Sequence, residues 1–166
     1  CGPNGAGKTT FLRALQQQLP LVSGQLSAGE TLRFGYYEQD GLKLPPDARM
    51  LDLVKEAVVE SDTEGGDAAS HDRRATGLLR QFLFSQGRWS QRVHDLSGGE
   101  RRRLQLLVVL AAQPNFLLLD EPTNDLDIDT MQVVEQFVLG FGGVLLVVSH
   151  DRWFLDRTCE RLFLLP

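Results

Sequence analysis

Residues 2–9, with the sequence GPNGAGKT, restrict the possible folds of this chain more than any other segment. Their order fits the phosphate-binding loop, in which small residues let backbone N–H groups point inward around the phosphates of a nucleotide. Such a loop lies between a strand and a helix, and the helix directs the positive end of its dipole at the phosphates. Because the chain begins at Cys1, inside this motif, we take it as an N-terminally truncated fragment.

Each side chain of the loop has a physical task. Lys8 adds a mobile cation, and the hydroxyl of Thr9 can ligate Mg²⁺. The nucleotide-binding residues predicted here are Gly2, Pro3, Asn4, Gly5, Ala6, Gly7, Lys8, Thr9 and Thr10. The motif therefore predicts a site for ATP and Mg²⁺.

Apolar runs predict the strands. The runs Phe116 to Leu119 and Val144 to Val148 are too short for typical helices, and Thr31 to Tyr37 is rich in β-forming residues. Runs without polar alternation are typical of parallel strands that are covered on both faces. We expect these three segments to form strands of a mainly parallel sheet.

Helical spacing occurs between these strands. Apolar residues recur at that spacing from Lys8 to Leu19, until Pro20 ends the pattern. Leu104 to Ala112 is apolar nearly all round, which indicates a buried helix, and Met131 to Leu139 supplies another. Strands that alternate with helices predict an α/β fold of the P-loop NTPase type, with flanking helices.

The middle of the chain, residues 41–95, is predicted to be a helical insert. Leu51 to Val59 and Ala75 to Phe84 have fair amphipathic spacing. Between them the polar segment Ser61 to Asp72 contains the pair Gly65-Gly66 and is predicted to be a flexible loop. We expect one domain over residues 1–166, with this insert inside it.

Composition excludes several classes of protein. A chain of 166 residues with 42% hydrophobic and 23% charged residues matches an ordinary globular domain and argues against disorder. The net charge of -5 gives no overall basic field for a polyanion. Cys1 and Cys159 are too few for a disulfide framework or a zinc site, which favours a reducing compartment. No apolar run approaches the length that crosses a bilayer.

Two carboxylates follow the predicted strand Phe116 to Leu119, at the ligand-binding edge of a parallel sheet. Asp120 can serve the Mg²⁺ shell. Glu121 is placed to act as general base on the attacking water. Taken alone, an acidic pair after a strand is most often a solvated strand end, so its meaning here depends on the phosphate-binding loop.

The segment Leu96-Ser97-Gly98-Gly99-Glu100 closely resembles the signature of the ABC ATPases. Ser97 could simply cap a helix. The resemblance implies in addition that the Ser97 hydroxyl and the backbone N–H groups of Gly98 and Gly99 bind the γ-phosphate of ATP held by a partner domain.

Three further residues match motifs of the same family, in the family's order. The resemblance implies that Gln39 reaches Mg²⁺ and the attacking water, and that His150 contacts the γ-phosphate. Asp125, within Asn124-Asp125-Leu126-Asp127, would lie in the loop that passes between the two domains, and Asp127 is also a candidate helix cap. His71 and His94 match no such motif.

The branch of the family is indicated by details that resemble the ABC-F proteins. These details are Phe34 to Gln39, Phe82-Leu83-Phe84, Leu96 to Arg103, Glu121 to Asp127 and Ser149 to Asp156. The form Asn-Asp-Leu-Asp resembles the Uup-like branch. The resemblance implies two such domains in one polypeptide, of which this chain is expected to be the second, and ATP-dependent action on ribosomes. The expected location is the cytoplasm, with the plastid stroma as the alternative.

Two other functions remain open from the sequence. The transporter ATPase subunits share every nucleotide motif and differ in their partner, and a nucleotide-gated interaction module could bind ATP without useful turnover. Arg101-Arg102-Arg103 could contact RNA, but a solvated helix face is the expected reading in an acidic chain. We expect Trp89 and Trp153 to pack inside the domain.

Overall fold

The computed structural model describes residues 1–3, 5–38, 41–63, 65–124 and 126–165. Within them, three parallel strands form one sheet in the order β1 (Phe34–Tyr37), β2 (Phe116–Asp120) and β3 (Val144–Val148). Phe116 of β2 pairs with Phe34 of β1 and Val144 of β3, so all three strands begin at the same level. Their carboxyl ends therefore meet at one edge of the sheet.

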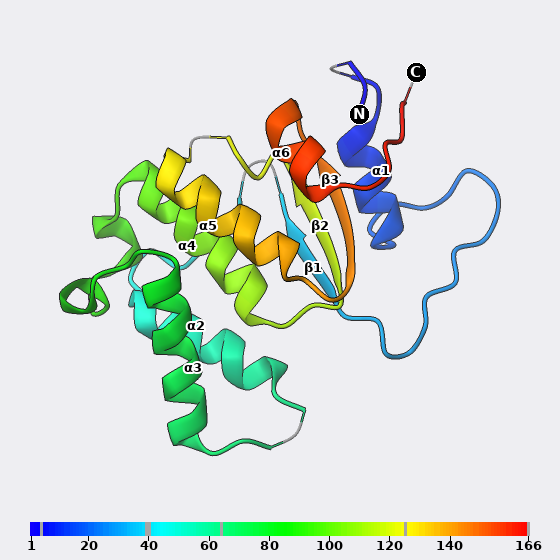
Figure 1. Ribbon diagram of the computed structural model, residues 1–166. Coiled ribbons are helices and arrows are strands. Elements are labelled where there is room, and N and C mark those ends of the chain that lie inside the picture. Colours follow the sequence, from blue (N-terminus) through cyan, green and yellow to red (C-terminus); the bar gives the residue numbers. More distant parts are fainter. Residues whose placement is uncertain (4, 39–40, 64, 125, 166) are drawn as a thin grey trace.

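Strand β2 is buried on both faces. Leu117 and Leu119 belong to the larger core, whereas Leu118, between them, packs with Leu12 of helix α1 (Lys8–Leu15) in a second core. Figure 1 shows α1 on one side of the sheet, with α4 (Gly98–Ala111) and α5 (Ile128–Leu139) on the other. This double cover explains the continuous apolar run of β2. The predicted α/β fold with a parallel sheet and flanking helices is confirmed.

Each of the last three helices in the described part of the chain begins with a side-chain cap that accepts a hydrogen bond from the third helical residue. The caps are Ser97 for α4, Asp127 for α5 and Asp151 for α6 (Arg152–Thr158). Such caps satisfy backbone N–H groups that the first helical turn leaves without a partner. The sequence thus fixes where α4, α5 and α6 start, all of them next to the motifs named above.

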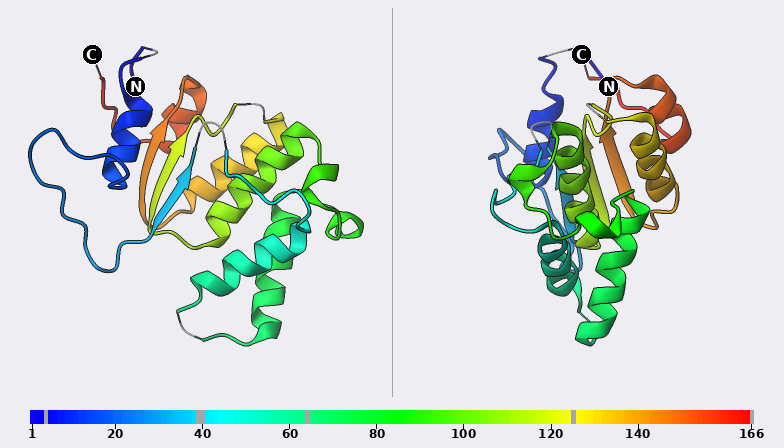
Figure 2. Two further views of the ribbon diagram at one scale, coloured as in Figure 1. Left: turned by 180° about the vertical axis from the view of Figure 1, so that it is seen from behind. Right: turned by 90° about the vertical axis from the view of Figure 1, so that its left-hand side faces the viewer.

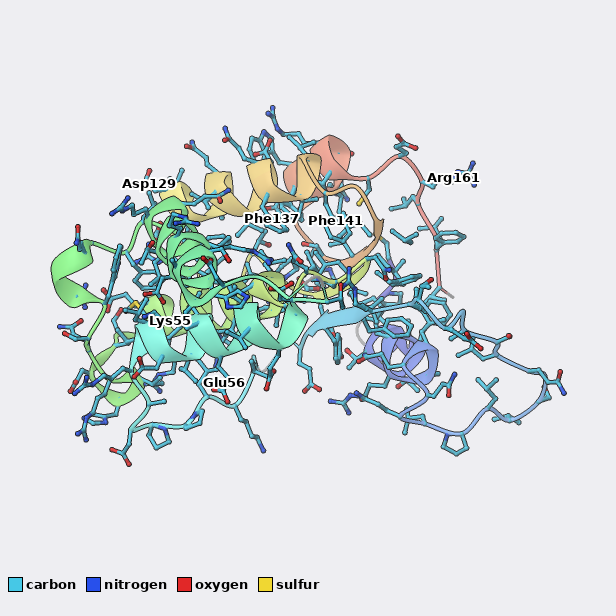
Figure 3. The ribbon with its side chains drawn as sticks, turned by 90° about the horizontal axis from the view of Figure 1, so that it is seen from below. Lys55, Glu56, Asp129, Phe137, Phe141 and Arg161 are labelled. Atoms are coloured by element: carbon cyan, nitrogen blue, oxygen red, sulfur yellow. The ribbon has the colours of Figure 1, made fainter. Side chains whose placement is uncertain are left out.

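The segment between β1 and α4 is helical. It forms α2 (Met50–Ser61) and α3 (Ala68–Gln81), then the short 3-10 helices η1 (Gln86–Arg88) and η2 (Val93–Asp95). Figure 2 shows α2 and α3 extending away from the sheet. Phe82, fully buried at the end of α3, lies 6.5 Å in ring centroids from Phe137 of α5. Phe137 and Phe141, which Figure 3 labels, continue this aromatic contact at 6.4 Å.

Several predicted boundaries are wrong by a few residues. Helix α1 ends at Leu15 rather than Leu19, because Gln17 adopts a left-handed backbone with φ 60° before Pro20 is reached. Strand β1 begins at Phe34 rather than Thr31. Helix α3 begins at Ala68, seven residues before the predicted start, because Asp67 caps it. Part of the predicted flexible loop is therefore helix.

The two tryptophans differ in their exposure to solvent. Trp89 is 6% exposed, as predicted for a packed residue. Trp153 is 51% exposed, and the guanidinium of Arg157 stacks 4.8 Å from its ring centroid, so the prediction of interior packing is wrong for this residue. Its place in the first turn of α6 leaves one ring face to solvent and the other to Arg157.

The two ends of the described chain lie side by side (Figure 1). The N–H of Leu165 donates to the carbonyl oxygen of Cys1 at 2.7 Å, and the amino group of Cys1 donates to the carbonyl of Phe163 at 2.6 Å. Among the helices described, none combines the length and the apolar character that a membrane crossing needs.

Candidate functional site

The phosphate-binding loop enters α1 through two glycines in left-handed backbone conformations. Gly5 has φ 87° and Gly7, the cap of α1, has φ 86°. L side chains rarely adopt these angles, and a Cβ atom built on either glycine would meet no atom within 4 Å. Backbone conformation, rather than packing, therefore requires glycine here, and the space beside the loop stays open for a ligand.

Lys8 lies at the start of α1 and folds back over this loop. Its Nζ donates to the carbonyl oxygens of Gly2 at 2.7 Å and Pro3 at 3.1 Å. The carbonyls hold the ammonium group at the mouth of the loop, where a phosphate oxygen would meet it. A cation at a helix N-terminus that already favours anions suits a triphosphate.

Thr9 and Asp120 join the loop to the sheet across 111 residues of sequence. The Oγ1 of Thr9 donates a hydrogen bond of 2.6 Å to Oδ2 of Asp120, which is 1% exposed at the end of β2. A hydroxyl and a carboxylate oxygen side by side are the hard ligands that Mg²⁺ prefers. This pair fits the Mg²⁺ predicted from the sequence, with the phosphates as its further ligands.

Glu121, the next residue, combines burial with backbone strain. Its φ of 52° lies in the left-handed region, which costs roughly 1–3 kcal/mol in a residue other than glycine. The N–H of Glu121 donates to the carbonyl oxygen of Val148 at 2.8 Å, and this bond holds the residue against the end of β3. Backbone strain of this kind is concentrated at functional sites, because the surrounding structure must maintain it.

The carboxylate of Glu121 faces His150. Its Oε2 accepts a hydrogen bond of 3.2 Å from the backbone N–H of His150. Its Oε1 lies 3.4 Å from Nε2 of His150, without hydrogen-bond geometry, and is buried with no hydrogen-bond partner. A buried carboxylate oxygen without a donor is costly unless something supplies one. A donor at this oxygen, from a ligand or a water molecule, would satisfy it.

The predicted signature forms the start of α4. The Oγ of Ser97 accepts from the N–H of Glu100 at 3.2 Å, while Oε2 of Glu100 accepts from the N–H of Ser97 at 3.0 Å. This reciprocal capping box confirms that Ser97 is a helix cap. Since the hydroxyl oxygen acts as the acceptor, its proton remains available to a ligand. Ser97 and Gly98 are exposed, and Gly99 is partly buried.

The signature and the phosphate-binding loop of this chain are not neighbours. Figure 1 shows the starts of α1 and α4 on opposite sides of the sheet, and the reverse view in Figure 2 agrees. Among the described residues of the Gly2 to Thr9 loop, Thr9 is hydrogen-bonded to Asp120, and none is hydrogen-bonded to Ser97. The structure thus brings together Thr9 with Asp120, and Glu121 with His150, but leaves the signature separate.

Three predicted residues, Asn4, Gln39 and Asp125, lie outside the described residues. Thr10, also predicted to bind nucleotide, is exposed in the first turn of α1. Asp127 caps α5 as expected, and its pKa is lowered chiefly by the hydrogen bond from the N–H of Thr130.

The prediction of a solvated helix face is wrong for Arg103. Its side chain is only 12% exposed, its Nη1 donates to Oγ1 of Thr130 at 3.0 Å, and its guanidinium lies 4.7 Å from the ring centroid of Phe84. It ties α4 to the start of α5. The spacing carried a signal, because Arg103 lies four residues before Leu107, which is fully buried on α4.

Arg88 was not singled out from the sequence either. Its guanidinium pairs with the carboxylate of Glu100, within the signature. The pKa of Glu100 is lowered to about 2, first by this bond and then by the N–H of Ser97, against the opposing effect of burial. Nothing in the spacing of residues 88 and 100 indicates this contact.

Comparison with known families shows to which family of nucleotide-binding proteins the chain belongs. The family described as ABC transporter matches residues 1–124, which include the loop, Asp120 and Glu121. The chain belongs to the ABC transporter family. This is a family of ATP-hydrolysing domains that typically bind ATP with Mg²⁺ and form dimers.

The similar relatives are proteins of the Uup, EttA and YfmR type, which confirms the predicted resemblance to the ABC-F branch. YfmR of Bacillus subtilis, an ABC transporter ATP-binding protein, is 44% identical over 97% of this chain and 25% of its own length. Uup of Escherichia coli is 41% identical over 95% and 24%. EttA of Mycobacterium tuberculosis, an energy-dependent translational throttle protein, is 36% identical over 97% and 28%. The chain spans about a quarter to a third of the length of these relatives and others like them.

Solved structures agree on the fold. An ATP-binding subunit of an ABC transporter superposes with a TM-score of 0.85 at 21% identity, over 99% of this chain and 72% of that chain. The ATP-binding cassette MJ0796, in a dimeric post-hydrolysis state with ADP and Pi, gives 0.79 at 22% identity, over 99% and 78%.

Proposed function

We propose that this chain is a nucleotide-binding domain that binds Mg-ATP at residues 2–9 and hydrolyses it when paired with a second such domain. The observation that carries the proposal is Glu121, a buried and strained carboxylate whose Oε1 has no hydrogen-bond partner. It directly follows Asp120, which is bonded to Thr9 of the phosphate-binding loop. A carboxylate in this place can accept a proton from a water that attacks the γ-phosphate.

The residues would divide the work as follows. Lys8 binds the terminal phosphate oxygens, and Thr9 and Asp120 hold Mg²⁺, which supplies charge neutralisation on those oxygens. Glu121 orients the attacking water and accepts its proton. His150, whose N–H holds Oε2 of Glu121, contacts the γ-phosphate. Gln39 would complete the contact with Mg²⁺ and water.

Pairing is proposed from the separation between the loop and the signature. Ser97 is exposed and lies across the sheet from residues 2–9 of the same chain (Figure 1). Ser97, Gly98 and Gly99 would therefore bind the ATP of a second domain, and Asp125 would lie between the two. The dimeric state recorded for MJ0796, a protein of this fold, supports pairing of two such domains.

The wider role is proposed from the relatives. We propose that residues 1–166 are one domain, with the helical insert at 41–95, and the second of two in an ABC-F protein. EttA, which is 36% identical to this chain, is named a translational throttle protein, and this supports a role at ribosomes in the cytoplasm.

The test is ATP turnover by the full-length protein that carries this chain, with and without purified ribosomes. Glu121→Gln should lower turnover about 10²–10⁴-fold while ATP still binds, because glutamine keeps the shape but cannot accept the proton. Glu56→Gln is the matched control, since Glu56 is an exposed carboxylate on α2, in the insert (Figure 3).

Stimulation by ribosomes that Glu121→Gln abolishes is the expected result. Unchanged turnover in Glu121→Gln would refute the assignment of the base. Turnover that is normal but indifferent to ribosomes would refute the role in translation and leave the ATPase proposal standing.

A further inference from the structure

We infer that Arg88 is a positioning residue of the paired ATP site: it fixes Glu100 against Ser97 and cancels a carboxylate charge that would otherwise repel the γ-phosphate. This inference rests on the proposed function, in which Ser97 binds the ATP of a partner domain. It concerns a residue of the helical insert, outside all the nucleotide motifs.

The geometry links Arg88 to Ser97 through one carboxylate. Oε1 of Glu100 pairs with Nη1 of Arg88, and Oε2 of the same group accepts the N–H of Ser97 at 3.0 Å. Both oxygens of Glu100 are thereby oriented, and the capping box holds the Ser97 hydroxyl at the helix start. Nε of Arg88 donates to Oε1 of Gln91 at 2.8 Å, which fixes the plane of the guanidinium. Because each oxygen has its own donor, the carboxylate is held in one orientation.

Electrostatics gives the pair its second task. Glu100 is the third residue of α4, next to the backbone N–H groups that would receive a phosphate. A bare carboxylate there competes with the phosphate for the positive end of the helix and repels it. The Glu100 side chain is only 17% exposed, so solvent screens its charge incompletely. Its pKa of about 2 means that it is ionised at neutral pH, and Arg88 supplies the compensating charge.

The insert, rather than α4, sets the position of Arg88. The adjacent Trp89 is buried, and its indole N–H donates to the carbonyl of Phe84 at 2.9 Å. The carbonyl of Trp89 in turn accepts the N–H of Leu51, in the first turn of α2, at 3.1 Å. Since these contacts belong to the insert, the ion pair joins the signature to the insert.

The experiment measures KM for ATP, kcat and ATP-dependent pairing in the full-length protein. Arg88→Met should raise KM about tenfold, with a smaller effect on kcat, because the unpaired charge of Glu100 opposes phosphate binding more than it opposes chemistry. Arg88→Lys keeps the charge and should stay near the wild-type KM. Arg80→Met is the matched control, because Arg80 stacks 5.5 Å from the ring centroid of Trp89 and, among the described residues, forms no hydrogen bond or ion pair with the signature.

The decisive variant is Arg88→Met combined with Glu100→Gln. Glutamine keeps an oxygen that can accept the N–H of Ser97 but carries no charge, so the double variant should recover the KM of Glu100→Gln alone. A purely structural role of Arg88 would give no such rescue. The inference is overturned if Arg88→Met behaves like Arg80→Met, if Arg88→Lys is as impaired as Arg88→Met, or if the double variant is no better than Arg88→Met.

Ser97→Ala separates this inference from the proposed function. If Ser97→Ala changes neither KM nor pairing, the proposed pairing itself fails. If Ser97→Ala impairs both and Arg88→Met impairs neither, the inference alone fails.

Discussion

The two sets of nucleotide motifs in this chain differ in how far folding completes them. The phosphate-binding loop and the carboxylates after β2 are joined within the chain, by the hydrogen bond from Thr9 to Asp120. The signature at Ser97 forms a complete capping box, yet it is exposed and meets no other nucleotide motif of its own chain in the part that the structure describes. Folding thus builds one half of the site, and under the proposed function a second domain supplies the nucleotide for the other half.

This difference predicts which variants should affect a single domain and which should affect only the pair. Changes at the loop and β2 should alter what a single domain does with Mg-ATP. Changes at the signature should leave nucleotide binding by a single domain intact and act only on the pair. Each variant below can therefore support the division or contradict it.

After Glu121→Gln, the largest effect is expected for Asp120→Asn. Asparagine can keep an acceptor for the hydroxyl of Thr9 but removes the charge that holds Mg²⁺, which is worth several kcal/mol in the transition state. Turnover should fall about 10²–10³-fold, and ATP binding should lose its dependence on Mg²⁺. Asp129→Asn, at an exposed position in the first turn of α5, is the control. Binding that still responds to Mg²⁺ in Asp120→Asn would contradict the assignment.

Ser97→Ala should lower turnover of the paired protein about 10- to 100-fold, because the pair loses one hydroxyl donor to the developing phosphate charge. Loss of the cap should also lower the free energy of unfolding by about 1 kcal/mol. Equilibrium titration of one domain with ATP should be unchanged. Weaker ATP binding by a single Ser97→Ala domain would break the division between the two halves.

Arg103→Met should lower stability without changing nucleotide binding. The variant loses the hydrogen bond to Thr130 and the contact with the ring of Phe84, and the free energy of unfolding should fall by about 1–2 kcal/mol. Urea denaturation measures this. Arg80→Met, an exposed arginine over Trp89, should cost less than about 0.5 kcal/mol, and equal losses in both variants would refute the special position of Arg103.

The smallest effect concerns pH. Because the pKa of Glu100 is held at about 2, below the usual 4.5, its contacts contribute fully above about pH 4.5 and are lost as the pH falls from there toward 2. Glu100→Gln should make stability less sensitive to pH in this window, by about 1 kcal/mol at most for a partly exposed ion pair. Thermal unfolding at the two ends of the window measures the difference, and equal pH sensitivity in both proteins would contradict it.

The sequence predicted the parts of the fold that depend on local patterns. The runs at Phe116 and Val144 became β2 and β3, and Ser97 and Asp127 cap helices as expected. The predicted start of α3 is wrong because the helix buries no residue before Ala75, and because its cap, Asp67, lies in the segment predicted to be a loop. Apolar periodicity indicates only those turns of a helix that are buried, and the first turns of this helix are not buried.

Contacts between distant segments could not be predicted from the sequence. The loop and the carboxylates could be assigned because their spacing carries a known chemistry, whereas Arg88 with Glu100 and Arg103 with Thr130 depend on how α4 packs on the insert and on α5. The exposure of Trp153 has a different explanation, because Arg157 lies four residues later on the same helix α6, and this local spacing places its guanidinium against the ring.

The central claim, that hydrolysis needs two domains, is tested most directly by ATP turnover in a sample of this chain that sedimentation shows to be monomeric in the same buffer. We expect such a sample to bind ATP and to hydrolyse it poorly. Turnover per domain should rise as the protein concentration increases and pairs form. Strong turnover by the monomer, independent of concentration, would contradict it.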